Sequence, residues 1–123
     1  MKRMLIGCGL AIVTGLSSPA WAGKDDHVLV QEAAKNVVTV SQVAKLTDET
    51  GVTLTGQISK HLQSDHYEFK DSSGSISVEI DDDIWRQAGL KVGDHVRLVG
   101  EVDTHRYKPT DIEVIKIEKY AHR

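Results

Sequence analysis

The chain has 123 residues, which is too short for two ordinary domains, so we expect one hydrophobic core. It carries 18 acidic and 15 basic residues, a formal net charge of −3 with histidine neutral. Proteins that bind nucleic acid need basic surface to displace counterions from phosphate groups, so this balance argues against a nucleic-acid partner.

The N-terminus has the features of an export signal. A basic start at Lys2 and Arg3 is followed by the apolar run MLIGCGLAIVTGL, and residues 20–22, AWA, fit the pattern of a signal peptidase site. We therefore predict that residues 1–22 are a signal peptide cleaved after Ala22, and that the mature protein is periplasmic. The apolar run is shorter than the roughly 20 residues that span a bilayer, and no second run follows it. No stable membrane insertion is expected after cleavage.

Cys8 offers a minor alternative, because the stretch LIGC (residues 5–8) resembles a lipoprotein attachment site. Almost no apolar segment precedes it, which leaves little to engage the export machinery. The chain has this one cysteine, so cleavage after Ala22 leaves none and makes a disulfide impossible. The mature domain must then be stabilised by its hydrophobic core alone.

Residues 23–38 open with charge and show no clear period, so we expect a flexible N-terminal segment with at most one frayed helical turn. The domain proper, residues 39–120, begins with Thr39 and Gln42 in a Thr-x-x-Gln capping box, which predicts a short helix over VSQVAKL. From Val52 the pattern alternates with a period of two over GVTLTGQISKHL, which predicts a half-buried strand.

The stretch HYEFKDSSGSISVE predicts a β-hairpin with a turn over DSSG. Tyr67 and Phe69 share one face of the first strand, and Ile76 and Val78 share one face of the second. Pairing Phe69 with Ile76 and Tyr67 with Val78 places both apolar sets toward the core. The outer face of the hairpin is then predicted to carry His66, Glu68, Lys70, Ser75, Ser77 and Glu79.

The rest of the chain completes an all-β fold. Three aspartates, residues 81–83, precede IWRQAGL, a helical turn that they would cap and whose apolar side chains would plug one end of a barrel. HVRLVGEVDT alternates again, and the last strand, DIEVIKIEKY, changes phase so that a bulge is expected near Val114. Gly56, in the first strand, marks a bend or a close neighbour. This order predicts a five-stranded OB-fold barrel with a short N-terminal helix and a helix between strands 3 and 4.

Three stretches, YEFKDSSGSISVEIDDDIW, KVGDHVRLVGEVD and DIEVIKIEK, are similar to the bacterial OB-fold (BOF) family of periplasmic YgiW/YdeI-type stress-tolerance proteins. The resemblance covers about residues 39–119. It implies an OB barrel behind a signal peptide, no catalysis, and a role in envelope stress that includes tolerance of cationic antimicrobial peptides and oxidants. The resemblance does not extend to the segment KDDHVLVQEAAKNVV or to the loop HRYKPT, and it supplies no ligand motif to transfer.

Carboxylates gather at Glu79 and at residues 81–83, which raises the alternative of a divalent-cation binder through the 79–83 acidic cluster. The alternating ligands and central glycine of a calcium loop are missing, and helix capping accounts for an aspartate, so we predict no metal and no cofactor. The histidines also lack metal-ligand spacing, so a zinc site would need tertiary convergence. They are His27, His61, His66, His95, His105 and His122.

A ligand groove is predicted between the outer hairpin face and the 103–110 loop, where OB folds usually bind their ligands. The loop sequence HRYK combines cations, an aromatic ring and hydrogen-bond donors, which suit a sugar or an anionic head group. A solvated turn ended by Pro109 is the alternative. The acidic residues Glu68, Glu79, Asp81 and Asp82 suit a cationic peptide instead. The candidate ligand-binding residues are His66, Glu68, Lys70, Glu79, His105, Arg106, Tyr107 and Lys108.

No nucleophile and base stand together in the sequence, so we expect no enzyme. With Tyr67 and Phe69 turned inward the hairpin lacks stacking aromatics, which is a second argument against nucleic acid. We expect a monomeric, periplasmic binding protein that contributes to envelope stress tolerance by binding an envelope component or a cationic peptide. The alternative from a different class is a protein–protein interaction module of an envelope assembly.

Overall fold

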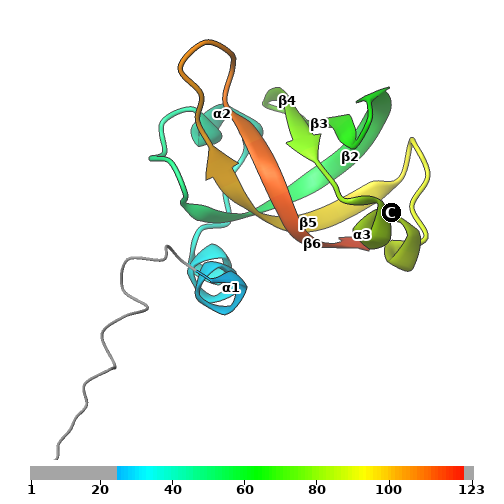
Figure 1. The fold of residues 1–123 in the computed structure, drawn as a ribbon, viewed down its shortest axis with the longest axis horizontal. Coiled ribbons are helices and arrows are strands. Elements are labelled where there is room, and N and C mark those ends of the chain that lie inside the picture. Colours follow the sequence, from blue (N-terminus) through cyan, green and yellow to red (C-terminus); the bar gives the residue numbers. More distant parts are fainter. Residues whose placement is uncertain (1–24, 121–123) are drawn as a thin grey trace, which may run out of the picture.

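The computed structural model describes residues 25–120, which form a five-stranded barrel with three helices around it (Figure 1). The helices are α1 (Asp26–Lys35), α2 (Val40–Val43) and α3 (Asp82–Ala88). The strands are β2 (Gly51–Gln63), β3 (His66–Asp71), β4 (Gly74–Glu79), β5 (His95–Asp103) and β6 (Asp111–Lys119). The predicted signal peptide, its cleavage site and Cys8 lie outside the described residues.

The barrel closes in the order β2-β3-β4-β6-β5. Four of its five strand pairs are antiparallel, and β4 meets β6 in parallel through Val78 opposite Ile112 and Glu79 opposite Glu113. This closure and the helix α3 between β4 and β5 are the plan of an OB fold. The predicted fold class is confirmed.

The hairpin β3–β4 has the register that its apolar pattern predicts. Phe69 lies opposite Ile76 and Tyr67 opposite Val78. Phe69 and Val78 are fully buried and Tyr67 is 7% exposed, so both rings point into the barrel. The outer face of the hairpin carries the polar set that the sequence predicts, including His66 opposite Glu79.

Local irregularities in the strands, among them a close approach at Gly56 and a bulge in β6, accompany closure of the sheet. A Cβ built at Gly56 in β2 would overlap the carbonyl oxygen of Lys70, so β3 crosses too close for any larger residue. In the β5–β6 pair, Val99 lies opposite Lys116 but Gly100 lies opposite Val114. The extra residue on β6 is the bulge expected near Val114.

The expectation of a flexible segment over residues 23–38 is wrong for most of that segment, because α1 is a ten-residue helix packed on the barrel (Figure 1). Its buried face consists of Leu29, 2% exposed, and Ala33, fully buried. The Thr53 hydroxyl in β2 donates a hydrogen bond to the Ala33 carbonyl oxygen over 2.9 Å. Apolar burial and a buried hydrogen bond therefore hold α1 in the domain.

The capping box of α2 is present, since the backbone N–H of Thr39 donates to Gln42 Oε1 over 2.8 Å. The helix itself is shorter than predicted and ends at Val43. A second contact fixes its start: Asp71 Oδ2, at the end of β3, accepts the Val40 N–H over 2.9 Å.

Helix α3 packs against the barrel core through the half-buried side chains of Ile84, Trp85 and Ala88, as predicted. The Trp85 ring stacks on Tyr67 with ring centroids 4.2 Å apart. Asp81 occupies the N-cap position, but its side chain makes no capping hydrogen bond, so the prediction that it caps the helix is wrong. Within residues 25–120, no helix combines the length and apolarity that a membrane crossing needs.

Candidate ligand-binding groove and acidic face

A groove of about 470 Å³ lies where the sequence predicts one, between the outer face of the β3–β4 hairpin and the loop before β6. The outer face is formed because the residues that alternate with Tyr67 and Phe69 must point away from the core. The lining includes His66, Glu68 and Ser77 from the hairpin and Lys108, Pro109 and Asp111 from the other side.

The structure brings only some of the candidate residues to this groove. His66, Glu68 and Lys108 line it, whereas Lys70 lines a separate hollow with Asp71 and His95. Tyr107 is 91% exposed and does not line the groove. The predicted use of the full HRYK loop as a ligand clamp therefore has no support in this geometry.

The remaining candidates lie beside the groove. Arg106 is exposed and absent from its lining, and Glu79 lies next to His66 across the hairpin. His105 contacts Asp111, with 3.2 Å between Nε2 and Oδ1. Lys108 is thus the one cation of the loop that reaches the groove lining.

Carboxylates cover the outer side of the sheet next to the groove. Glu79 lies opposite Glu113 in the β4–β6 pair, and Glu113 lies opposite Glu101 in the β5–β6 pair. Asp103 and Asp111 form the next pair along β5 and β6. Because the intervening residues of these strands are buried, the acids point away from the barrel core, and Asp111 among them is covered to 7% exposure. We call this surface the acidic face: Glu68, Glu79, Glu101, Asp103, Asp111 and Glu113.

The acidic face holds negative charge that no lysine or arginine of residues 25–120 balances. Burial raises the pKa of Glu79, and the Asp65 and Glu113 carboxylates raise this pKa further. Burial, followed by neighbouring carboxylates, likewise raises the pKa of Glu101 and Glu113. Within the part of the chain that the structure describes, these three glutamates have no lysine or arginine at ion-pairing distance.

Two groups of side chains bring possible metal-ligand atoms within 4.8 Å of one another. One consists of Asp65, Glu79 and Asp81, and includes part of the predicted 79–83 cluster. Asp83 is not part of it and pairs with Arg86 instead. The other group consists of Asp103, His105 and Asp111, at the ends of β5 and β6.

The family is shown by comparison with known proteins. The chain matches the protein family described as "Bacterial OB fold (BOF) protein" over residues 15–119. The chain belongs to the bacterial OB-fold family. OB folds serve binding, and the family is not known for catalysis, so membership fits a small binding protein.

Curated bacterial OB-fold relatives match most of the chain. Protein YgiW of Escherichia coli is 39% identical over 84 residues, which are 68% of this chain and 64% of YgiW. The match thus spans slightly less than two thirds of that relative. CarO of Pseudomonas aeruginosa, named as a calcium-regulated OB-fold protein, is 35% identical over 71% of this chain and 76% of CarO. An uncharacterized protein of Haemophilus influenzae is 26% identical over 97% of this chain and 98% of its own length.

Solved structures agree with the family assignment. E. coli YgiW superposes with a TM-score of 0.62 at 40% identity, covering 69% of this chain and 90% of that structure. A murine DNA-binding protein bound with double-stranded DNA gives a TM-score of 0.55 at 17% identity, covering 81% and 56% of the two chains. At that low identity the similarity shows the OB fold alone.

Most of the acidic face of this bacterial OB-fold domain was not predicted from the sequence. Glu68 and Glu79 were among the predicted acids, whereas the four acids of β5 and β6 were not. The signal was present, because EVD at residues 101–103 and DIE at residues 111–113 mirror each other around the loop. An antiparallel pairing across that loop must place like charges opposite each other.

Proposed function

We propose that this bacterial OB-fold protein is a non-enzymatic periplasmic binding protein that holds a cationic peptide on its acidic face and in the adjoining groove. Such capture would contribute to envelope stress tolerance by keeping membrane-active peptides from their target. The observation that carries the proposal is the acidic face, whose glutamates lie opposite one another with no lysine or arginine at ion-pairing distance among residues 25–120. The proposed periplasmic location is based on the signal peptide predicted at residues 1–22.

A lysine-rich or arginine-rich peptide fits this surface electrostatically. Like charges placed opposite each other across a sheet are destabilising, and a bound cation relieves that repulsion. The groove next to the face also offers apolar atoms, because Leu62, Ile76 and Pro109 are among its lining residues. An amphipathic cationic peptide could therefore place its charges on the carboxylates and an apolar side chain in the groove.

An envelope component with a sugar or an anionic head group is a weaker candidate. It would depend on Lys108, which lines the groove together with the carboxylates of Glu68 and Asp111. An anionic head group would meet those two negative charges at short range. The same electrostatics that favour a cationic peptide thus disfavour an anionic ligand.

The test is a calorimetric titration of the purified protein with a synthetic amphipathic lysine-rich peptide at low and at high salt. We expect the affinity to fall about tenfold or more between about 0.01 M and 0.5 M salt, since screening shortens the range of exposed charges. The double variant Glu79→Gln, Glu113→Gln should weaken binding strongly at low salt. The matched control Glu118→Gln, an exposed acid on β6 outside the acidic face, should leave binding unchanged.

Unchanged affinity in the double variant would refute the acidic face as the site. Salt-independent binding would refute the charge argument. A glycan fragment that binds in competition with the peptide and depends on Lys108 would favour the envelope component. Location is tested separately, by cell fractionation and by sequencing the N-terminus of the mature protein, which should begin at Gly23.

A further inference from the structure

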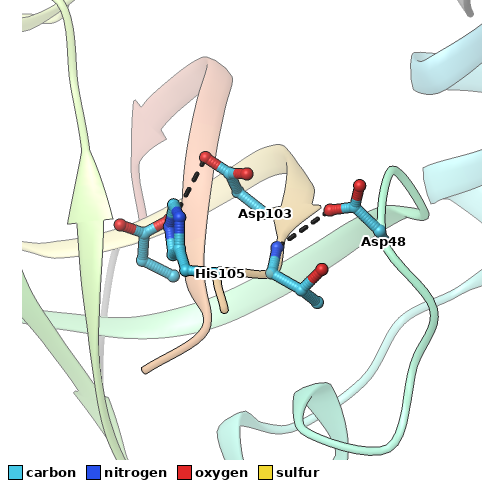
Figure 2. Close-up of polar contacts among 5 residues, drawn as sticks. Asp48, Asp103 and His105 are labelled. Carbon is cyan, nitrogen blue, oxygen red and sulfur yellow. Dashed lines mark hydrogen bonds and ion pairs between the residues drawn. The ribbon is translucent and has the colours of Figure 1, made fainter. Parts of the chain in front are cut away.

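Asp103, His105 and Asp111 form a compact group at the loop end of the β5–β6 hairpin. Figure 2 shows Asp103 beside His105. His105 Nε2 lies 3.2 Å from Asp111 Oδ1 and 3.7 Å from Asp103 Oδ2. Asp111 is only 7% exposed. One imidazole nitrogen thus faces two carboxylates, one of them buried.

The fold, rather than chance proximity on a flexible surface, assembles this group. Asp103 and Asp111 are directly opposite in the last pair of the β5–β6 ladder, so the sheet register holds the two carboxylates together. His105 is positioned by the first residues of the loop. The backbone N–H of Thr104 donates to Asp48 Oδ1 over 2.8 Å, which ties the loop next to His105 to the segment before β2 (Figure 2).

The charge of the group calls for a cation. In the part of the chain that the structure describes, neither Asp103 nor Asp111 has a lysine or arginine at ion-pairing distance. A histidine carries at most one positive charge, so His105 alone cannot balance two ionised carboxylates. Neutral imidazole and ionised carboxylate are instead the protonation states in which these side chains bind metals.

The spacing fits a small ion with mixed nitrogen and oxygen ligands. Ligand atoms bound about 2.0–2.1 Å from a tetrahedral zinc ion lie roughly 3.3 Å apart. The two separations from His105 Nε2, 3.2 Å and 3.7 Å, fall on either side of that value. Calcium prefers six to eight oxygen ligands, so the imidazole favours a zinc-class ion over calcium.

We propose that Asp103, His105 and Asp111 bind one divalent cation of the zinc class, each through one side-chain atom. Three protein ligands leave a fourth position open, as in zinc sites that act on or hold an exchangeable ligand. Asp111 also lines the groove, so that position would face its end. The site shares Asp103 and Asp111 with the acidic face. Peptide capture is tested through Glu79 and Glu113, which are not ligands here, so the two proposals can fail independently.

The untagged protein is titrated with zinc chloride in a calorimeter. A second titration, with cobalt chloride, is monitored by visible absorption. We expect one zinc ion per chain and d–d absorption bands of four-coordinate cobalt. His105→Ala and Asp111→Asn should each weaken zinc binding about tenfold or more, as loss of even a supporting residue does at metal sites. His105→Gln provides a second variant of similar shape, and circular dichroism confirms that each variant is folded.

Two controls separate this site from adventitious binding. His61→Ala removes an exposed histidine whose Nε2 contacts the Ser64 carbonyl oxygen, and Asp81→Asn disrupts the all-carboxylate group. Both variants should bind zinc as tightly as the parent protein. Absence of zinc binding, or binding that survives His105→Ala and His105→Gln, or that is lost in His61→Ala or Asp81→Asn, would overturn the proposal.

Discussion

Asp71 joins the β3–β4 turn to the start of α2, and its replacement provides a sharp test of how the barrel end is held. Asp71 Oδ2 accepts the Val40 N–H over 2.9 Å, across 31 residues of sequence. Asp71 Oδ1 accepts the Ser73 N–H over 2.8 Å and the Ser73 hydroxyl over 2.6 Å. The carboxylate thus supplies the helix cap of α2 and closes the hairpin turn at the same time.

The expected cost of Asp71→Asn follows from these contacts. The Val40 side chain is 6% exposed, and its N–H lies in a partly buried contact, so losing a charged acceptor there costs about 1–3 kcal/mol. The Ser73 contacts are exposed and water can replace them, so they add only about 0.5 kcal/mol. We expect Asp71→Asn to lower the free energy of unfolding by about 2–3 kcal/mol at pH 7.

Urea unfolding followed by circular dichroism measures this difference, and Asp83→Asn is the matched control. Asp83 forms an exposed ion pair with Arg86, and such pairs contribute little, so the control should change stability by less than about 0.5 kcal/mol. A loss at Asp71 no larger than that of the control would refute the capping argument.

The pH dependence of the Asp71 effect is a second check on it. Burial raises the pKa of Asp71, but hydrogen bonds from Ser73, from the Val40 N–H and from Gly74 outweigh burial, and its pKa is lowered overall. A carboxyl whose pKa is lower when folded contributes stability above its unfolded pKa, and this contribution is lost as pH falls through the folded pKa. The difference between parent and Asp71→Asn should therefore be full at pH 7 and shrink below about pH 4. A difference that stays constant down to about pH 2 would contradict the assigned cause.

Three further variants test other parts of the fold. Gly56→Ala should lower the free energy of unfolding by about 2–3 kcal/mol, because the Cβ of the alanine would overlap the Lys70 carbonyl oxygen. Thermal unfolding measures this loss, and an unchanged melting temperature would refute the close approach of β3. Leu29→Ala should cost about 2–4 kcal/mol in urea unfolding if α1 belongs to the domain core, whereas a neutral result would make α1 an appendage. Glu79→Gln should stabilise the protein at pH 7, because a carboxyl whose pKa is raised by folding opposes folding when it is ionised. This gain in stability should vanish as pH falls through the raised pKa of Glu79. A loss of stability at pH 7 would contradict the charge argument.

The barrel was predictable because its sequence pattern and its register depend on the same alternation. Tyr67 and Phe69 could face the core only if the hairpin paired as it does, so one apolar pattern determined the orientation of every polar residue on that hairpin. The bulge near Val114 was visible for the same reason, as a change in the phase of the alternation.

Helix α1 was missed because its buried face is narrow. Only Leu29 and Ala33, four residues apart, are buried, while Val28 and Val30 obscure the helical period. The available signal was Asp25, whose Oδ1 accepts the Val28 N–H over 3.0 Å, an N-cap followed by a weak apolar stripe. That stripe becomes a packing surface only once β2 is placed beneath it, and position in the barrel is not encoded locally.

The position of the candidate groove was predicted from the sequence, but the set of residues that line it was not. The groove follows from the fold, yet which side chains line it depends on the path of a loop, and Arg106 and Tyr107 are not among them. The group of Asp103, His105 and Asp111 has no sequence spacing typical of a metal site, since it forms only when two strand ends meet.

The acidic face is best explained as a functional feature, because it costs stability. Aligning Glu79, Glu113 and Glu101 across three neighbouring strands places like charges opposite each other, where uncharged residues would make a more stable sheet. A residue with a purely structural role would lose stability and binding together when replaced. Glu79→Gln should instead raise the free energy of unfolding and weaken the binding of a cationic peptide. Opposite changes in stability and affinity, measured on this one variant, would indicate that the carboxylate of Glu79 serves ligand binding. If both quantities fall together, the glutamates serve the fold and the proposed binding surface must be abandoned.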